Sequence, residues 1–537
     1  MTFDRGPRFP WRLFTGVFAA LFCLLGAWSL ATPIFAVPDE ASHTIRATAA
    51  AHGQIVGDGK YFEAPGYLYI PGAGACFAGR PDTTPACVGE SPYGGDLRRT
   101  LSTAGTNSPV YYLWTGLPSL ALTGEAAIFG MRLFSAALVA VLFAAAAVLI
   151  RSMRGARWAL LLPIVAITPE TVFLGGAINP NAVEAAAAGA LFAALLVLAR
   201  GRPSGWLFGF AATTAVVATA FVTGGRSLGM LWVLVAGAGV LVLLRGDDVR
   251  ALVRRASTWW VLGVLAVVCA GQLYWFTRPD NAVRAQLKPT PGSLFTVAQT
   301  MVENTFVYLR QLTGQFGTMD VPAPEGVQTL WTALFLAIVI LPLVLGRGRE
   351  RWLAAGLTLL WLIVPVVVQV ALWRQVGDVW QGRYMLAVLF LTAIAGGLAL
   401  DRARDLRGAE PAPASPMAAR GTISVVRTLI VLVAVGHLAA FAFTLRRYAV
   451  TSGSWTEFLL RPTWQPPAGT VALTALVVLV LAASVVLVWR SLPALFEVPG
   501  ASDAPPSGAP ESPGGQGASR SGSSDTRAFA SGSHKNS

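Results

Sequence analysis

Residues 37–46 read VPDEASHTIR and mark the point where the first long apolar run of the chain ends and charged residues begin. Pro38 suits the first position of an α-helix, because the N–H that proline lacks would have no partner there. Asp39 and Glu40 then fall in the first turn, where the helix dipole stabilises anions by up to about 1 kcal/mol. The stretch therefore predicts a helix that begins at Pro38, directly after a membrane-length segment.

Within that helix, Asp39, His43 and Arg46 are spaced at i, i+4 and i+7, so their side chains share one face. A carboxylate, an imidazole and a guanidinium would then line one stripe at the membrane surface. A helix start with solvated charges has the same spacing, so these ten residues alone leave both a functional site and a solvated surface open.

The composition is that of a multipass α-helical membrane protein. Of 537 residues, 54% are hydrophobic and only 12% are charged, and the mean hydropathy is +0.59, whereas soluble domains carry roughly 25% charged residues. Apolar runs of about 18–25 residues, the length that crosses a ~30 Å hydrocarbon layer, recur along the chain. Twelve spans are expected, the first over about residues 11–35 and the others centred near residues 138, 166, 190, 214, 236, 267, 337, 362, 391, 434 and 480.

The arginines indicate the topology. The net charge is +13, and 15 of the 37 arginines cluster in five short turns between apolar runs, at residues 151–157, 200–202, 245–255, 347–351 and 402–407. When twelve spans are counted, these turns fall on the same side as the basic N-terminus, and the positive-inside rule makes that side cytoplasmic. The sequence thus predicts a bacterial cell-membrane protein with an uncleaved first span, both termini in the cytoplasm, the lipid bilayer as its surroundings and no nucleic-acid partner.

The expected domain organisation is a membrane domain over residues 1–490 and a tail, 491–537. The tail is rich in Gly, Ser and Pro with little apolar content, which predicts a disordered cytoplasmic end. Two long loops, residues 37–125 and 278–328, lie on the extracytoplasmic side.

Each long loop carries a local structural prediction. In the first, Cys76 and Cys87 are expected to form a disulfide bond in an oxidising compartment, with a stabilisation of ~2–3 kcal/mol. In the second, residues 293–316 are amphipathic and predict a helix in the interface plane, because Glu303 or Arg310 at mid-bilayer would each cost ~2.5–3.5 kcal/mol.

Several nucleotide and metal motifs are absent from the sequence. It has no phosphate loop of the Gly-x-x-x-x-Gly-Lys-Ser/Thr type, no His-Glu-x-x-His and no Cys-x-x-Cys. Nucleotide-driven pumping within this chain is therefore not expected. Polar functional residues instead gather on the outer side, at residues 39–46, at the Asn107–Tyr112 segment, at Asn179-Pro180-Asn181, at Arg310 and at Gln381-Gly382-Arg383-Tyr384.

Four motifs in the right order resemble the bacterial membrane family labelled domain of unknown function 2142. They are PDEASH at 38–43, SPVYY at 108–112 with RLFS at 132–135, the segment from Thr168-Pro169 to Asn179-Pro180-Asn181, and QGRY at 381–384. The resemblance covers about residues 15–490. That family is similar to the GT-C class of glycosyltransferases, which includes protein O-mannosyltransferases. The resemblance implies an all-α, GT-C-like polytopic fold of about twelve transmembrane helices with two long extracytoplasmic loops.

The same resemblance implies a reaction. In GT-C enzymes an acidic residue at the head of the first outer loop is catalytic, and Asp39 stands at that position with Glu40 beside it. The family pattern has Pro after Asp-Glu, where this chain has Ala41. The implied activity is transfer of a sugar from a polyprenyl-phosphate carrier to a glycan, lipid or protein acceptor of the cell envelope.

The residue chemistry agrees with that implication. Direct displacement needs a base for the acceptor hydroxyl and cations for the leaving phosphate. Asp39 is the predicted base, or a ligand of Mg²⁺ or Mn²⁺, and Glu40 is predicted to assist it. A guanidinium pairs with phosphate through two hydrogen bonds. The other predicted substrate-binding residues are His43, Arg46, Tyr111, Asn179, Asn181, Arg310 and Arg383.

Two other functions remain open at this point. A transporter or flippase for lipid-linked glycans would place ionisable residues near the midplane of its spans, whereas the charges here gather outside them. A non-catalytic protein of envelope assembly would tolerate the loss of Asp39 and Arg383.

Overall fold

The computed structural model describes residues 8–201, 203–278, 292–407 and 416–496, and these are predominantly helical. Its helices are α1 (Trp11–Ala31), α2 (Glu40–Ala51), α3 (Pro109–Gly116), α4 (Gly124–Arg151), α5 (Trp158–Ala166), α6 (Pro169–Gly175), α7 (Pro180–Arg200), α8 (Gly205–Gly225), α9 (Gly229–Leu243), α10 (Gly246–Val253), α11 (Ala256–Thr277), α12 (Leu294–Glu303), α13 (Thr305–Thr313), α14 (Glu325–Leu345), α15 (Gly348–Val376), α16 (Leu386–Arg407), α17 (Pro416–Val450), α18 (Trp455–Leu460) and α19 (Thr470–Phe496).

Ten helices in the described ranges are long and apolar enough to cross a bilayer, and the number rises to twelve when two bent pairs each count as one span. The bent pairs are α5 with α6, at 70°, and α9 with α10, at 118°. The first bend has a local cause. Thr168 has an extended backbone conformation between the two helices, and its hydroxyl caps α6 by accepting a hydrogen bond from the N–H of Thr171. The predicted multipass α-helical fold is confirmed.

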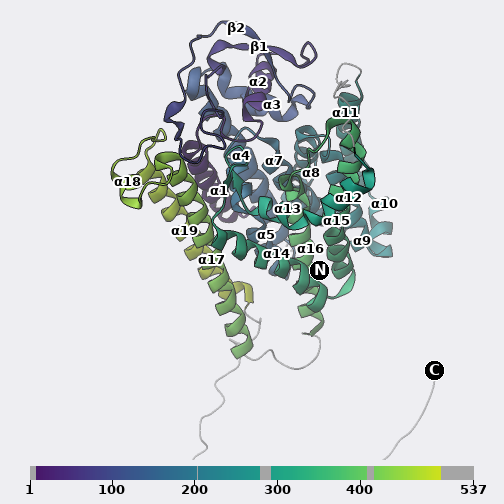
Figure 1. Cartoon of the computed structure of the whole chain (residues 1–537). Helices are drawn as coiled ribbons and strands as arrows, with labels where there is room; N and C mark the ends of the chain where they lie inside the picture. The colour runs from purple at the N-terminus through teal and green to yellow at the C-terminus, as the bar shows by residue number, and fades with distance from the viewer. Residues whose placement is uncertain (1–7, 202, 279–291, 408–415, 497–537) are drawn as a thin grey trace, which may run out of the picture. The chain divides into compact units, whose positions relative to one another are not determined.

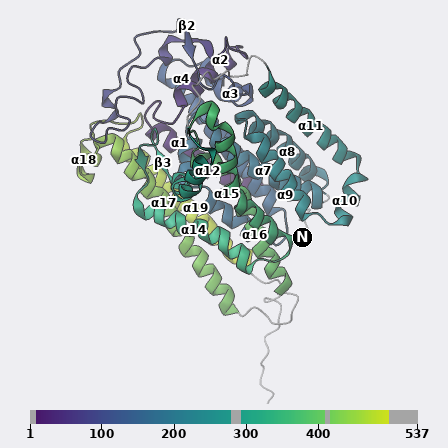
Figure 2. The same ribbon diagram turned by 45° about the vertical axis from the view of Figure 1, so that its right-hand side comes forward.

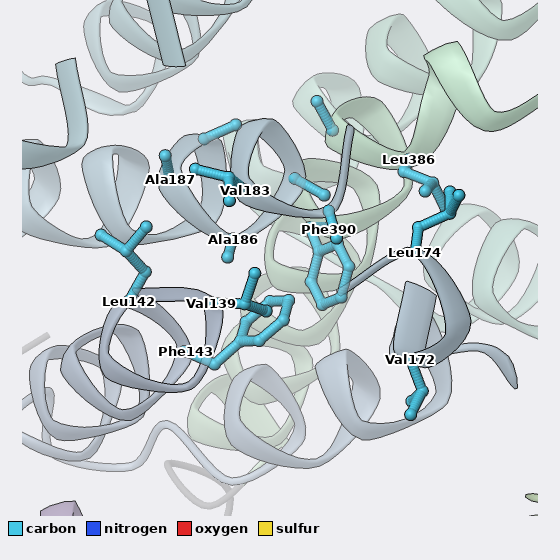
Figure 3. Close-up of a cluster of buried hydrophobic side chains, with 14 of the residues drawn as sticks. Val139, Leu142, Phe143, Val172, Leu174, Val183, Ala186, Ala187, Leu386 and Phe390 are labelled. Carbon is cyan, nitrogen blue, oxygen red and sulfur yellow. The ribbon is translucent and has the colours of Figure 1, made fainter. Parts of the chain in front are cut away.

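The centre of the bundle is formed by α7 and α16, whose side chains are buried almost all round. Small residues allow this, because the Ala- and Gly-rich sequence of α7 lets neighbouring backbones approach closely. Figure 3 shows Val183 and Ala186 of α7 facing Val139 and Phe143 of α4, with Phe390 of α16 between the helices. This packed centre fixes the positions of the helix ends that carry the polar residues.

The outer helices have the opposite pattern. Along α11, large apolar side chains such as Trp260 and Val267 are exposed, as expected for a helix that faces lipid. Figure 2 shows α8, α9 and α11 side by side, with α10 turned across their end. The exposed apolar surface of the bundle therefore matches a hydrocarbon environment.

The first long loop folds at one end of the bundle, where α2, α3, β1 and β2 gather (Figure 1). Strand β1 (Tyr61–Pro65) pairs antiparallel with β2 (Leu97–Leu101), with Tyr61 opposite Leu101. Cys76 and Cys87 form a disulfide bond, with their Cα atoms 6.2 Å apart. Arg447, near the end of α17, donates to three carbonyls of the loop between these cysteines, those of Phe77, Arg80 and Thr83.

The second long loop differs in detail from the sequence prediction. Its amphipathic segment is two helices, α12 and α13, which meet at Asn304, and β3 (Gln315–Phe316) and β4 (Val321–Pro322) follow. The predicted apolar face turns inward, with Met301 and Leu312 buried, whereas Glu303 is exposed. Residues 279–291 of this loop lie outside the described ranges.

The C-terminal boundary also differs. Helix α19 continues to Phe496, so residues 491–496 of the predicted tail are helical, because the apolar sequence of the last span extends to that point. Residues 497–537 lie outside the described part of the chain.

Candidate active site

Asp39 lies in a sharp turn between the first span and α2. Its φ of 63° and ψ of 2° are left-handed, a conformation uncommon for non-glycine residues but most accessible to Asn and Asp. The helix begins at Glu40, so the predicted start at Pro38 was wrong. The reason is this turn, which sends the side chains of Asp39 and Glu40 into different surroundings.

Glu40 is wholly buried and forms a bidentate ion pair with Arg132 of α4. Nε of Arg132 donates to Oε1 at 2.8 Å and Nη2 donates to Oε2 at 2.6 Å. The N–H of Ile178 also donates to Oε1 at 3.2 Å. Arg132 also donates to the carbonyls of Ser29, in the last turn of α1, and of Thr32 and Pro33, which follow it. Glu40 therefore joins α2 to α4 and to the segment before α7, and does not face Asp39 as a second carboxylate.

The Asp39 carboxylate is about half exposed, at 47%, and faces two arginines. Nη2 of Arg383 lies 3.0 Å from its Oδ2, and Nη2 of Arg226 lies 3.8 Å from the same atom. Both arginines are largely buried, and the ring of Tyr384 lies 4.9 Å from the Arg226 guanidinium carbon. A carboxylate open to solvent is thus held against two desolvated cations.

Helix α13 positions Arg383. The arginine lies on a short 3₁₀-helix, Gly382–Met385. A Cβ atom at Gly382 would lie 2.2 Å from the carbonyl oxygen of Tyr308, so only glycine permits this approach. The Gly382 N–H donates to Oε1 of Gln311 at 2.6 Å. Gln311 therefore anchors the turn that carries Arg383.

The two arginines retain free donor capacity. Nε and Nη1 of Arg383 and Nε of Arg226 are buried and have no hydrogen-bond partner in the part of the chain that the structure describes. Buried donors are normally paired, so three unpaired guanidinium nitrogens beside one carboxylate leave donors available to an anion. Arg226 was not predicted from the sequence. The sequence does mark Arg226 as unusual, because it follows the fifth span on the outer side, where the positive-inside rule does not favour an arginine.

His43 adds a neutral donor. Nδ2 of Asn107 donates to the Tyr112 hydroxyl at 2.9 Å, and that hydroxyl lies 2.8 Å from Nδ1 of His43. Burial raises the pKa of Tyr112 to about 12, so the phenol keeps its proton and donates it to Nδ1. The His43 proton must then be on Nε2, which is buried and unpaired within the described ranges.

The charge state of His43 follows from its surroundings. Burial, together with the positive charges of Arg226 and Arg383, holds the pKa of His43 well below its usual value of 6.5. The imidazole is therefore neutral at physiological pH. The Nε2–H group near two guanidinium groups adds a fourth donor to the cluster.

Two buried carboxylates flank the arginines. Glu170 of α6 interacts electrostatically with Arg383 and accepts a hydrogen bond from the N–H of Gln315 at 2.9 Å. Glu184 of α7 interacts electrostatically with Arg226. We call Asp39, His43, Glu184, Arg226 and Arg383 the polar cluster.

Three other predicted residues lie in different surroundings. Arg46 is buried and donates through Nη1 and Nη2 to the carbonyls of Gln54, Ile55 and Asn107, so only its Nε is unpaired among the described residues. The Tyr111 hydroxyl lies 3.0 Å from the hydroxyl of Ser135 in the core. Arg310 forms an exposed ion pair with Glu325 at 2.5 Å.

The Asn179 segment supports the Asp39 turn. Nδ2 of Asn179 donates to the carbonyl oxygen of Pro38 at 3.1 Å, and its Oδ1 caps α7 by accepting from the N–H of Asn181. Asn179 is thus a positioning residue. The structure brings Asp39, His43 and Arg383 together, with Asn179 behind them.

The polar cluster does not fit a metal ion. No group of three His, Cys, Asp or Glu side chains that could hold a metal occurs among the described residues. The oxygen of Asp39 that would bind a cation faces two guanidinium groups, whose positive charges would repel a divalent ion.

Comparisons with known proteins give a family match and two structural similarities. The family described as "Predicted membrane protein (DUF2142)" matches residues 22–392. No protein with a curated description matches the sequence significantly. Among solved structures, the chain is similar to ArnT from Cupriavidus metallidurans in the apo state, at 14% identity and a TM-score of 0.42, over 89% of this chain and 76% of that one. ArnT from the same organism bound to undecaprenyl phosphate has 14% identity and a TM-score of 0.41, over 90% and 78%.

Proposed function

The chain belongs to the DUF2142 family of predicted membrane proteins, and on that premise we propose that it is a GT-C-like glycosyltransferase. It moves a sugar from a polyprenyl-phosphate carrier to a cell-envelope acceptor. The observation that carries the proposal is the half-exposed Asp39 carboxylate, held by Arg226 and Arg383, whose remaining N–H groups are in part buried and unpaired across the described ranges.

The donors suit a phosphate. A phosphate oxygen accepts several hydrogen bonds, and charge-assisted bonds from guanidinium groups are about twice as strong as neutral ones. Arg383, Arg226 and the Nε2–H of His43 supply unpaired donors for it within the described ranges. Such fixed donors stabilise charge that develops on a leaving group.

The reaction then balances with the residues present. The oxygen of the acceptor hydroxyl forms a bond to the anomeric carbon as the bond between that carbon and the phosphate oxygen breaks. The electron pair leaves with the carrier phosphate, whose negative charge the arginines stabilise. Asp39 takes the hydroxyl proton as general base. Glu40, paired with Arg132, maintains the turn that places Asp39.

We place the polar cluster at the extracytoplasmic face of the bacterial plasma membrane, with both termini in the cytoplasm. Helix α7 supports this orientation, because it begins beside Asp39 and ends at Arg200, in one of the arginine-rich turns. The positive-inside rule assigns those turns to the cytoplasm. A lipid-linked donor is the sugar source suited to that face, where nucleotide sugars are absent.

The test is sugar transfer by the purified full-length protein in nanodiscs with radiolabelled polyprenyl-phosphate hexoses and pentoses. Asp39→Asn should lower turnover by about 100-fold or more with an unchanged unfolding temperature. Asp58→Asn is the matched control, because Asp58 is an exposed aspartate in the first loop that pairs with Arg99. Full turnover in Asp39→Asn would remove the proposed base, and carrier crossing without glycosidic bond formation would favour a transporter.

A further inference from the structure

Two buried hydrogen-bond acceptors lie at the start of α7, and one of them belongs to Glu184 of the polar cluster. Asn181 and Glu184, in the first turns of α7, are 2% and 4% exposed. Oδ1 of Asn181 and Oε1 of Glu184 have no hydrogen-bond partner in the ranges that the structure describes. Residues three apart on a helix share one face, so the two acceptors are neighbours.

A chain of hydrogen bonds fixes the amide of Asn181. The carbonyl of Pro38 can only accept a hydrogen bond, so the Asn179 side-chain atom that contacts it is Nδ2, the donor. The Oδ1 of Asn179 therefore points towards Asn181. That oxygen accepts from Nδ2 of Asn181 at 2.7 Å. Asn181 must therefore turn its Oδ1 away from Asn179, and it offers an acceptor to a ligand.

Glu184 is held by the end of α8. A Cβ atom at Gly225 would lie 3.0 Å from Cγ of Glu184, so the glutamate stem rests against a backbone without a side chain. The next residue, Arg226, interacts electrostatically with Glu184 and lies 3.8 Å from Oδ2 of Asp39. Glu184 and the Asp39 carboxylate thus flank the same arginine.

We propose that Asn181 and Glu184 form a hydroxyl-binding wall that recognises a neutral sugar on the carrier by accepting hydrogen bonds from its hydroxyl groups. This inference rests on the proposed function and adds the substrate class. A hydroxyl-rich neutral ring supplies the donors that both oxygens lack. A uronic acid would bring a carboxylate, which accepts hydrogen bonds as the unpaired Asn181 and Glu184 oxygens do, so it would supply neither oxygen with a donor.

The experiment measures binding of three probes to the full-length protein in nanodiscs: polyprenyl phosphate alone, and the same carrier with a neutral hexose or a hexuronic acid. Asn181→Leu keeps the size of the side chain and the backbone N–H that donates to Asn179, but removes the amide oxygen together with the Nδ2 donor to Asn179. Glu184→Gln keeps the shape and replaces one carboxyl oxygen with an NH₂ donor. Glu350→Gln is the control, because Glu350 is a buried glutamate that pairs with Arg200 at the opposite end of α7.

The wild-type protein should bind the hexose-linked carrier more tightly than the bare carrier, and the uronic acid form more weakly. Asn181→Leu should weaken binding of the hexose-linked carrier by about tenfold and leave the bare carrier unchanged. Glu184→Gln should reduce the discrimination against the uronic acid by a similar factor. Glu350→Gln should change neither ratio.

Two failures are distinguishable. If the wild-type protein binds the bare carrier but the sugar adds no affinity, or if both variants keep the wild-type ratios, the hydroxyl-binding wall is wrong and the proposed function stands. If no form of the carrier binds, the proposed function fails and the wall fails with it.

Discussion

Asp39 and Glu40 are adjacent in sequence and opposite in environment: the Asp39 side chain is 47% exposed between two arginines, whereas the Glu40 side chain is wholly buried against Arg132. The left-handed backbone at Asp39 separates them. One carboxylate is therefore available for chemistry, and the other is part of the structure that positions it.

Glu40→Gln should destabilise the protein strongly, because the change leaves the Arg132 charge buried without a counter-charge. Breaking a buried pair by removing one partner costs about 3–5 kcal/mol. The unfolding temperature of the detergent-solubilised protein should fall clearly, while Asp39→Asn should leave it near the wild-type value, since asparagine tolerates a left-handed conformation. Equal stability of Glu40→Gln and wild type would contradict the structural role of Glu40.

Arg226→Lys and Arg383→Lys should each weaken binding of polyprenyl phosphate by about tenfold. Lysine keeps the charge but loses the planar donors that a guanidinium offers to a phosphate. Titration of a labelled carrier into nanodiscs measures the change. Arg310→Lys is the matched control, since Arg310 pairs with Glu325 at the surface, and its affinity should equal that of the wild type. Loss of affinity in that control alone would move the phosphate site to the second loop.

The stability of the protein should fall as the pH is lowered from about 6.5, where an unfolded histidine begins to bind a proton. Burial and the two arginines hold the pKa of His43 well below that value. Below about pH 6.5 the unfolded state therefore binds a proton at His43 that the folded state does not bind, and this favours unfolding. In the His43→Gln variant this part of the pH dependence should disappear. Thermal unfolding from pH 7.5 to 5 measures both proteins, and parallel curves would show that His43 is not the group responsible.

The sequence predicted the membrane spans well, because span length and arginine placement depend on the bilayer and not on the details of packing. It also identified Asp39 and Arg383, which are 344 positions apart and meet at 3.0 Å. Both stand at the outer ends of apolar runs, and so the topology alone brings them to one end of the bundle.

The sequence could not predict which charged residues at that end are structural and which are functional. Glu40 and Arg46 are as polar in sequence as Asp39, and their burial depends on partners from α4 and from the first loop. Arg226 contacts Asp39 only because α8 ends beside α2, a relation that no local pattern encodes. Tertiary contacts therefore divide the charged residues into structural and functional ones.

Sugar transfer should be insensitive to EDTA. The Asp39 carboxylate already faces two guanidinium groups, and a divalent ion there would have to overcome their repulsion. Turnover of the labelled carrier after chelation should equal that of the untreated protein, with re-added Mg²⁺ and Mn²⁺ as the control. Loss of turnover that Mn²⁺ alone restores would reinstate a metal at Asp39.

Removal of the Cys76–Cys87 disulfide should loosen the first loop and leave the helix bundle intact. The bond closes a short loop, and closing a loop of this length stabilises by about 3 kcal/mol. Arg447 and Asp320 hold the same loop, the first through carbonyls and the second through the N–H of Gly79 at 2.8 Å. Hydrogen exchange should therefore accelerate at residues 77–87 in the Cys76→Ser/Cys87→Ser variant, while exchange in α7 stays slow. Cys23→Ser, which removes a thiol within α1, should show the wild-type pattern, and faster exchange throughout the bundle of the double variant would show that the disulfide stabilises more than its own loop.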